Sequence, residues 1–172
     1  MDKNYTICLL DKKKHDVDDF ACGTDALDVY LKEKASQEVK KKVAAVYIIT
    51  EKAVKRSIGY YTLSSCSIAL TNLPETVTRK LPKYNALPAV LIGRLAVDKK
   101  FQGKRIGEYL LLDALSRSYL LSRQIGSFAV IVDAKNEKSK SFYERYGFLQ
   151  SVKHPLKLYL PMGTIKNLIN NK

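Results

Sequence analysis

The segment RLAVDKKFQGKRIGEYLLLDAL, residues 94–115, decides the fold, because an apolar strand, a short basic loop and the start of a long helix follow one another in it. The first main-chain N–H groups of a helix have no partner within the helix and lie at its positive end. Gly103 and Gly107 carry no Cβ that would keep a ligand from the main chain, and Lys104 and Arg105 add positive charge. The loop is therefore a candidate site for a pyrophosphate. Tight packing with a solvated basic turn is the alternative.

The sequence on both sides of this segment predicts alternating strands and helices. Apolar and β-branched runs predict strands at 5–10, 43–50, 57–68, 88–98, 127–134 and 155–162. Helical spacing predicts helices at 24–42, with Thr24 as N-cap, within 101–115, at 136–148, where Gly147 ends the helix, and over 163–172. The polar turn EKAVKR predicts a hairpin between the strands at 43–50 and 57–68, and strand–helix–strand crossovers follow it. Residues 71–88 are expected to form a loop, with or without one helical turn. The order predicts one mixed α/β (α+β) domain over residues 1–172, with a central mixed sheet flanked by helices.

Composition excludes several classes of protein. The 30 Lys and Arg residues against 17 Asp and Glu give a net charge of +13, which favours a polyanionic partner such as nucleic acid, although basicity can also serve solubility alone. The three cysteines lie far apart without a Cys/His cluster, so we expect no disulfide framework and no metal. No apolar stretch approaches the roughly 18 residues of a membrane span, which predicts a cytoplasmic protein without a membrane partner.

Two motifs resemble those of the GNAT acetyltransferases. In QGKRIG the residues Gln102 and Gly107 match the two ends of the family's (Arg/Gln)-x-x-Gly-x-(Gly/Ala) coenzyme A loop, and Arg105 stands at its middle glycine. In NEKSKSFYERYGF, residues 136–148, the positions Asn136 and Tyr143 match a second family segment. The resemblance covers most of the chain and implies the GNAT acyl-CoA N-acyltransferase fold, with acetyl-CoA as co-substrate.

Further segments resemble one branch of the family, the GNAT toxins of type II toxin–antitoxin systems. These segments are FACGTDALDVYL (20–31), GYYTLSS (59–65) and SVKHPLKLYLPM (151–162). The branch implies acetylation of the α-amine of aminoacyl-tRNA, which stops translation. It also implies a small DNA-binding antitoxin as partner and a homodimer as an expectation. Which aminoacyl-tRNA is preferred does not follow from the sequence.

The resemblance also implies roles for particular residues. Tyr143 is expected to be the general acid that protonates the leaving thiolate. The remaining residues expected to bind the coenzyme are Leu95, Ala96, Val97, Gln102, Gly103, Lys104, Arg105, Ile106, Gly107, Asn136 and Ser139. Asn136, Ser139 and Tyr143 are expected on one helix face, and Tyr146 is expected to be the core tyrosine of this segment. Arg94, Lys32 and Lys40 are candidates for binding tRNA phosphates, with ordinary surface cations as the alternative.

The scarcity of candidate bases favours one class of acceptor. No Glu lies between Glu75 and Glu108, and Asp98 is expected to end its strand as a turn residue. An α-amine of pKa about 7.7 is roughly one-sixth neutral at pH 7, whereas a lysine of pKa about 10.4 is neutral about once in ~2,500. A site without a base therefore favours an α-amine, as on an aminoacyl ester.

Two other functions stay open at the level of sequence. The first is a GNAT enzyme that acetylates a protein N-terminus or a small-molecule amine; a polyamine would require an acidic pocket, which the net charge disfavours. The second is a GNAT-fold protein that binds nucleic acid or coenzyme A without turnover. Such a protein would not need a leaving-group acid at Tyr143, so replacing this residue by Phe separates the enzyme from the binder.

Overall fold

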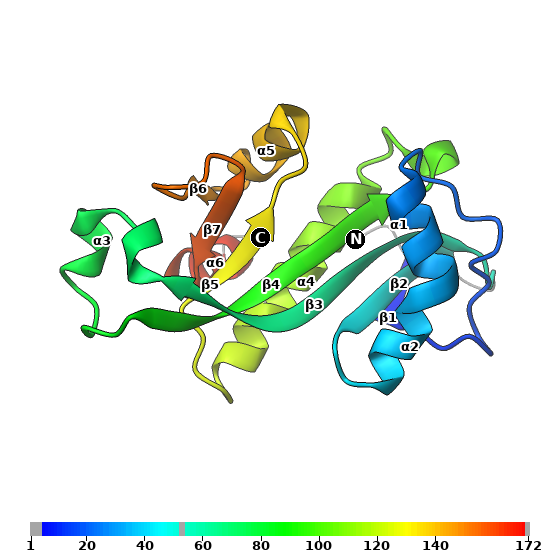
Figure 1. The fold of residues 1–172 in the computed structure, drawn as a ribbon. Helices are drawn as coiled ribbons and strands as arrows, with labels where there is room; N and C mark the ends of the chain where they lie inside the picture. Colours follow the sequence, from blue (N-terminus) through cyan, green and yellow to red (C-terminus); the bar gives the residue numbers. More distant parts are fainter. Residues whose placement is uncertain (1–4, 52–53, 171–172) are drawn as a thin grey trace. The chain divides into compact units, whose positions relative to one another are not determined.

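A computed structural model describes residues 5–51 and 54–170, and it divides into two compact units. The first unit comprises residues 1–64 and 93–114, and the second comprises residues 65–92 and 115–172. Strands β3 (Ser57–Ala69) and β4 (Ala86–Val97) and helix α4 (Ile106–Ser122) each continue from one unit into the other (Figure 1). The single domain expected over residues 1–172 stays a prediction.

The first unit contains an antiparallel meander. Strand β1 (Tyr5–Leu9) pairs with β2 (Ala45–Glu51), and β2 pairs with β3, both in antiparallel register. A register shift lies between Ile49 and Thr50. The expected strands at 5–10, 43–50 and 57–68 and their hairpin are confirmed. Residues 52 and 53 of the expected turn lie outside the described residues.

A helical segment with an irregular centre follows the first strand. It consists of α1 (Asp25–Val29), the π-helix η1 (Tyr30–Lys34) and α2 (Ala35–Lys40). Tyr30, Leu31 and Ala35 point into a core with Phe20, Val46 and Tyr60, among others. The prediction of one regular helix over 24–42 is wrong in two respects, because a π turn interrupts it and it ends at Lys40. Thr24 takes the expected N-cap position, although its side chain makes no capping hydrogen bond.

The second unit continues the sheet beyond β4. Strand β5 (Ala129–Asp133) pairs parallel with β4, as the crossover through α4 predicts, and antiparallel with β7 (Lys157–Pro161). The two-residue strand β6 (Leu149–Gln150) pairs with β7 and was not expected. Among residues 5–51 and 54–170 the seven strands have the order β1-β2-β3-β4-β5-β7-β6, which confirms a mixed sheet flanked by helices.

Short helical elements complete the chain. The predicted loop at 71–88 contains one short helix, α3 (Glu75–Thr78), and η2 (Leu70–Asn72) overlaps its start. Strand β4 begins at residue 86 rather than 88. Element η3 (Lys99–Phe101) precedes α4, while α5 (Glu137–Glu144) and α6 (Met162–Asn170) lie where helices were expected. Residues 171 and 172 of the last predicted helix lie outside the described residues. Gly147 ends the α5 segment with φ +86°, as predicted.

Candidate active site

The end of strand β4 and the start of helix α4 hold the predicted coenzyme loop within the first unit. Leu95 and Val97 are half-buried and Ala96 is buried, and Asp98 ends the strand. Helix α4 starts at Ile106, which is buried, so Gly107 lies within its first turn and not ahead of it. Residues 102–105 form the exposed turn between η3 and α4. The structure therefore brings the predicted strand and loop residues together in one continuous segment.

The main chain of this loop is open to a ligand. Outside the regular bonds of α4, no hydrogen bond is found in the described part of the chain for the N–H groups of residues 103–107. Gly103 has φ +78°, and a Cβ placed on it would meet no atom within 4 Å. Both features fit the pyrophosphate of a coenzyme, which needs main-chain donors and close approach.

Arg105 stands where the motif usually has its middle glycine, and its backbone has the left-handed conformation that glycine favours. Its φ is +61°, in the left-handed region, where a residue with a Cβ carries a cost of roughly 1–2 kcal/mol. Its side chain is exposed and its Nε lies 2.9 Å from Glu108 Oε2. Lys104 lies with its Nζ 4.9 Å from the centre of the Phe101 ring. The loop thus keeps a glycine-like turn and adds two cations beside it.

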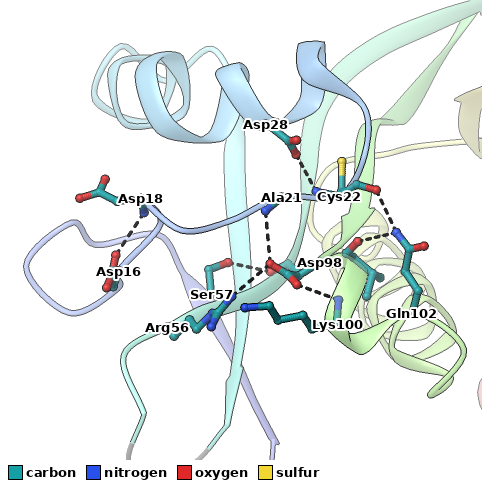
Figure 2. A network of polar contacts seen from close by, with 12 residues as sticks. Asp16, Asp18, Ala21, Cys22, Asp28, Arg56, Ser57, Asp98, Lys100 and Gln102 are labelled. Carbon is teal, nitrogen blue, oxygen red and sulfur yellow. Dashed lines mark hydrogen bonds and ion pairs between the residues drawn. The ribbon is translucent and has the colours of Figure 1, made fainter.

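The side chain of Gln102 holds the loop to the rest of the first unit. Its Nε2 donates to the carbonyl of Cys22 at 2.9 Å and to the carbonyl of Val97 at 3.0 Å. The amide therefore joins the loop, the end of β4 and the N-terminal segment (Figure 2). Sequence reasoning placed Gln102 among the coenzyme ligands, and the structure shows its side chain engaged in protein contacts.

Asp98 forms the centre of a buried polar network beside this loop. Its carboxylate accepts from the main-chain N–H groups of Lys100 at 2.9 Å and Ala21 at 3.2 Å, and Arg56 Nη2 lies 3.5 Å away (Figure 2). The residue is 1% exposed. This confirms the expected turn role, and a carboxylate so enclosed and occupied is a poor general base. The network links the strand end to residues 16–22, a connection that local sequence patterns do not reveal.

Arg94 stacks on an aromatic ring of the irregular helix. Its Cζ lies 3.6 Å from the centre of the Tyr30 ring, and no hydrogen bond or ion pair is found for its guanidinium among the described residues. Lys32 is half-buried and Lys40 is exposed. Within residues 5–51 and 54–170, no hydrogen bond or ion pair joins either lysine side chain to another candidate residue. Tyr30, whose ring carries this stack, was not among the site residues expected from the sequence.

Tyr143 lies on α5 in the second unit, within an aromatic cluster. Phe142 and Phe148 contact its ring with centroid distances of 5.2 and 5.4 Å. Burial raises the pKa of Tyr143 to about 12, so its phenol keeps its proton at physiological pH. Tyr146 is only half-buried, so the expectation that it is the core tyrosine of this segment is wrong. The turn at Gly147 brings Phe148 back onto Tyr143 and explains the reversal.

Asn136 and Ser139 form the N-terminal cap of α5. The Asn136 side chain accepts from the Ser139 N–H at 2.9 Å and from its hydroxyl at 3.0 Å. Asn136 has φ −162°, outside the helix, so the prediction that it shares a helix face with Tyr143 is wrong. Asn136 and Ser139 are brought together, but they form the N-terminal cap of α5.

The described residues contain no group of His, Cys, Asp or Glu side chains that could hold a metal ion. No helix among them is both long enough and apolar enough to cross a membrane. The candidate residues offer main-chain N–H donors at 103–107, the cations Lys104 and Arg105, and the protonated phenol of Tyr143.

Comparisons with known proteins agree with this arrangement. The model of the acetyltransferase (GNAT) domain matches residues 44–150. A probable toxin TacT of Sinorhizobium fredii is 32% identical over 93% of this chain and 92% of its own length. A tRNA-acetylating toxin of Mycobacterium tuberculosis is 33% identical over 91% of this chain and 92% of its own length.

Solved structures show the same similarity. AtaT complexed with acetyl-methionyl-tRNAfMet has a TM-score of 0.90 and 29% identity, covering 96% of this chain and 99% of its own. Related structures contain AtaTR bound with acetyl-CoA and a KacTA–DNA complex. A tyrosine-to-phenylalanine mutant of KacT is also among them, with a TM-score of 0.91 and 33% identity over 96% of this chain and 99% of its own.

Proposed function

This chain belongs to the GNAT acetyltransferase family, and from that premise we propose that it transfers the acetyl group of acetyl-CoA to the α-amine of aminoacyl-tRNA and so acts as a translation-blocking toxin. One observation carries the proposal. The loop with open main-chain donors belongs to a chain that is similar over nine-tenths of its length to a tRNA-acetylating toxin. Its relatives in solved structures suggest a DNA-binding antitoxin as a further partner.

The first unit supplies the proposed coenzyme site. The strand segment Leu95–Val97 would hold the pantetheine arm, and the N–H groups of residues 103–107 would hold the pyrophosphate. Lys104 and Arg105 would add charge to this site. Gln102 would act through its two carbonyl contacts, which hold the loop in place. Asn136 and Ser139 would contribute by fixing the start of the helix that carries Tyr143.

The reaction would be a direct displacement. The neutral amine would attack the thioester carbonyl, the C–S bond would break, and the thiolate would take a proton from Tyr143. The acylated nitrogen would release its proton to solvent, and solvent would return a proton to the Tyr143 phenolate, so that the products are a neutral amide and a thiol. Transfer from a phenol of pKa about 12 to a thiolate of pKa about 8.5 is uphill, so it requires close contact between the phenol and the leaving sulfur. An amine that is already partly neutral removes the need for a base, in line with the enclosed state of Asp98.

Labelled acetyl-CoA mixed with a pool of charged tRNAs tests the proposal. We expect label on the aminoacyl end of one or a few tRNAs. Tyr143→Phe should lower the rate by about 10²- to 10⁴-fold, the usual contribution of a positioned acid, while acetyl-CoA binding is retained. Tyr146→Phe is the matched control, because it removes the hydroxyl of a neighbouring tyrosine, and it should keep its activity.

Two results would contradict the proposal. The absence of label on tRNA, with acetyl-CoA binding demonstrated by calorimetry, would remove aminoacyl-tRNA as substrate and direct the search to peptide N-termini. Unchanged activity in Tyr143→Phe would contradict the role of Tyr143 as general acid, while the proposed acetyltransferase activity would stand.

A further inference from the structure

Arg94 is held by an aromatic ring and not by an acidic partner. It interrupts the apolar strand β4, where a guanidinium requires compensation for its desolvation. The Tyr30 ring lies 3.6 Å from its Cζ, so the flat face of the guanidinium is covered. No carboxylate pairs with it in the described part of the chain. Stacking leaves the N–H edge of the guanidinium, which carries its donors, unbound by the protein.

Tyr30 is fixed on its other sides. It is 2% exposed, and its ring stacks on Tyr60 with a centroid distance of 6.1 Å and an interplanar angle of 22°. Its hydroxyl donates to Glu38 Oε2 at 2.7 Å, and the hydroxyl of Tyr60 donates to the Leu27 carbonyl at 2.8 Å. Burial and then Glu38 raise the pKa of Tyr30, so the phenol remains a donor. The Tyr30 ring on which the Arg94 guanidinium stacks therefore has a fixed orientation.

The π turn brings Tyr30 and Glu38 together. The turn begins at Tyr30, whose carbonyl accepts from the N–H of Ala35, five residues later. In a regular α-helix, residues seven apart lie on one face after about two turns. The wider turn takes up one additional residue, which places position 38 above position 30. Such π turns are frequent at functional sites.

We propose that Tyr30, oriented by Glu38 through the π turn, is a positioning residue that presents the edge of the Arg94 guanidinium to a phosphodiester of the nucleic-acid substrate. The inference rests on the proposed function. Arg94 precedes Leu95–Val97, the segment assigned to the pantetheine arm, whereas the pyrophosphate loop begins five residues after that segment. Arg94 and the loop proposed for the coenzyme phosphates therefore lie on opposite sides of this segment along the chain, so the anion assigned to Arg94 is one of the acceptor and not a coenzyme phosphate. A planar guanidinium with a free edge suits a phosphate through paired hydrogen bonds.

Binding of aminoacyl-tRNA at several KCl concentrations, together with KM and kcat, tests this proposal. Arg94→Gln should weaken tRNA binding roughly 10- to 100-fold, the usual range for hydrogen bonds to a charged group, and reduce the salt slope by about 0.7–0.9. Arg94→Lys keeps the charge and the slope but loses the stacked, two-pronged geometry, so its KM should still rise. Tyr30→Leu should resemble Arg94→Gln, and Tyr30→Phe and Glu38→Gln should raise KM less. Acetyl-CoA affinity and kcat should change little in all of them.

The control and the contrary outcomes are distinct. Arg79→Gln alters an exposed arginine in an ion pair with Glu75 and should change neither KM nor the slope. If Tyr30→Leu does not fold, Tyr30→Phe and Arg94→Lys still decide the matter. Wild-type KM and slope in folded Arg94→Gln would overturn the inference, as would an equal loss of acetyl-CoA affinity. In contrast, wild-type protein that fails to bind or acetylate aminoacyl-tRNA would overturn the proposed function itself.

Discussion

At the scale of the residue, burial sets the protonation state of Tyr143, the proposed general acid. Its ring lies among Phe142 and Phe148, and this environment raises its pKa to about 12. A tyrosine with the ordinary pKa of about 10 would lose its proton over the alkaline range in which amines are most reactive. Tyr143 stays protonated there. The same burial makes it a weaker acid, so its effect depends on contact with the leaving group.

The pH profile of acetyl transfer should reflect the raised pKa of Tyr143. The rate should rise with pH as the substrate amine loses its proton near its pKa of about 7.7, and then stay level up to about pH 10. No falling limb is expected there, because Tyr143 ionises only near pH 12. Single-turnover rates, measured faster than the ester hydrolyses, give this profile, and Tyr143→Phe should show the same shape at a lower plateau. A falling limb near pH 10 in the wild type that is absent from Tyr143→Phe would contradict the expectation.

Arg105 illustrates a substitution that sequence patterns misjudge. A glycine at this place of the motif suggests that a side chain would disturb the turn. The backbone nevertheless takes a left-handed φ of +61°, and the side chain extends to Glu108. The motif therefore specifies a backbone conformation, which an arginine can adopt at a modest cost in folding free energy.

At the scale of the element, the strand end at Asp98 is a junction. Its carboxylate connects residues 98–100 with Ala21 and Arg56, and Gln102 connects the next turn with Cys22. These bonds fix a loop that follows a strand end, where a chain without such support is mobile. The proposed coenzyme loop thus takes its rigidity from residues about eighty positions earlier.

Asp98→Asn should weaken the contacts of this carboxylate with Ala21 and with Arg56. The amide leaves one buried donor without its acceptor and removes the charge facing Arg56, which should lower the free energy of unfolding by about 1–3 kcal/mol. Hydrogen exchange should rise in the segment 16–28, most of all at the amide of Ala21. Asp133→Asn is the matched control, since Asp133 also ends a strand but is exposed, and it should change the stability by under about 0.5 kcal/mol. Equal effects of the two substitutions would count against the junction.

The sequence was sufficient for most elements because their patterns are local. The hairpin at 45–69, the parallel crossover through α4 and the turn at Gly147 follow from apolar runs, glycines and helical spacing. The π turn, the burial of Tyr143 and the cap at Asn136 depend on tertiary packing, which periodicity does not contain. Strand β6 has two residues and leaves no periodic signal. The stacking of Arg94 on Tyr30 joins two segments that are far apart in the chain and could not be predicted from either alone.

At the scale of the whole molecule, the dominant property is the net charge of +13. Such a charge attracts any polyanion, so affinity for tRNA alone does not identify a binding face. Specific phosphate contacts release condensed counterions and change the slope of affinity against salt. A change in net charge elsewhere alters the overall field more uniformly. The two contributions can be separated by variants of equal charge.

We expect the double variant Lys32→Gln, Lys40→Gln to reduce the salt slope of tRNA binding by about 1 to 2, if both lysines contact phosphates. The double variant Lys138→Gln, Lys166→Gln removes the same charge from exposed positions on α5 and α6, and it should leave the slope nearly unchanged. Fluorescence anisotropy across KCl concentrations measures both. Equal shifts in the two variants would show that the lysines of the irregular helix act only through net charge.

The junction at Asp98 also has a consequence for how the protein is made. Ala21 and Cys22 leave the ribosome ahead of their partners, which lie 77 and 80 residues later in the chain. At about 5–20 residues per second, the N-terminal segment waits roughly 4 to 16 seconds before residues 98 and 102 have even been added. The coenzyme loop and the segment that supports it therefore assemble only in the second half of synthesis. A chain that terminates before residue 98 lacks the proposed pyrophosphate loop and Tyr143, so we expect it to be unable to transfer an acetyl group.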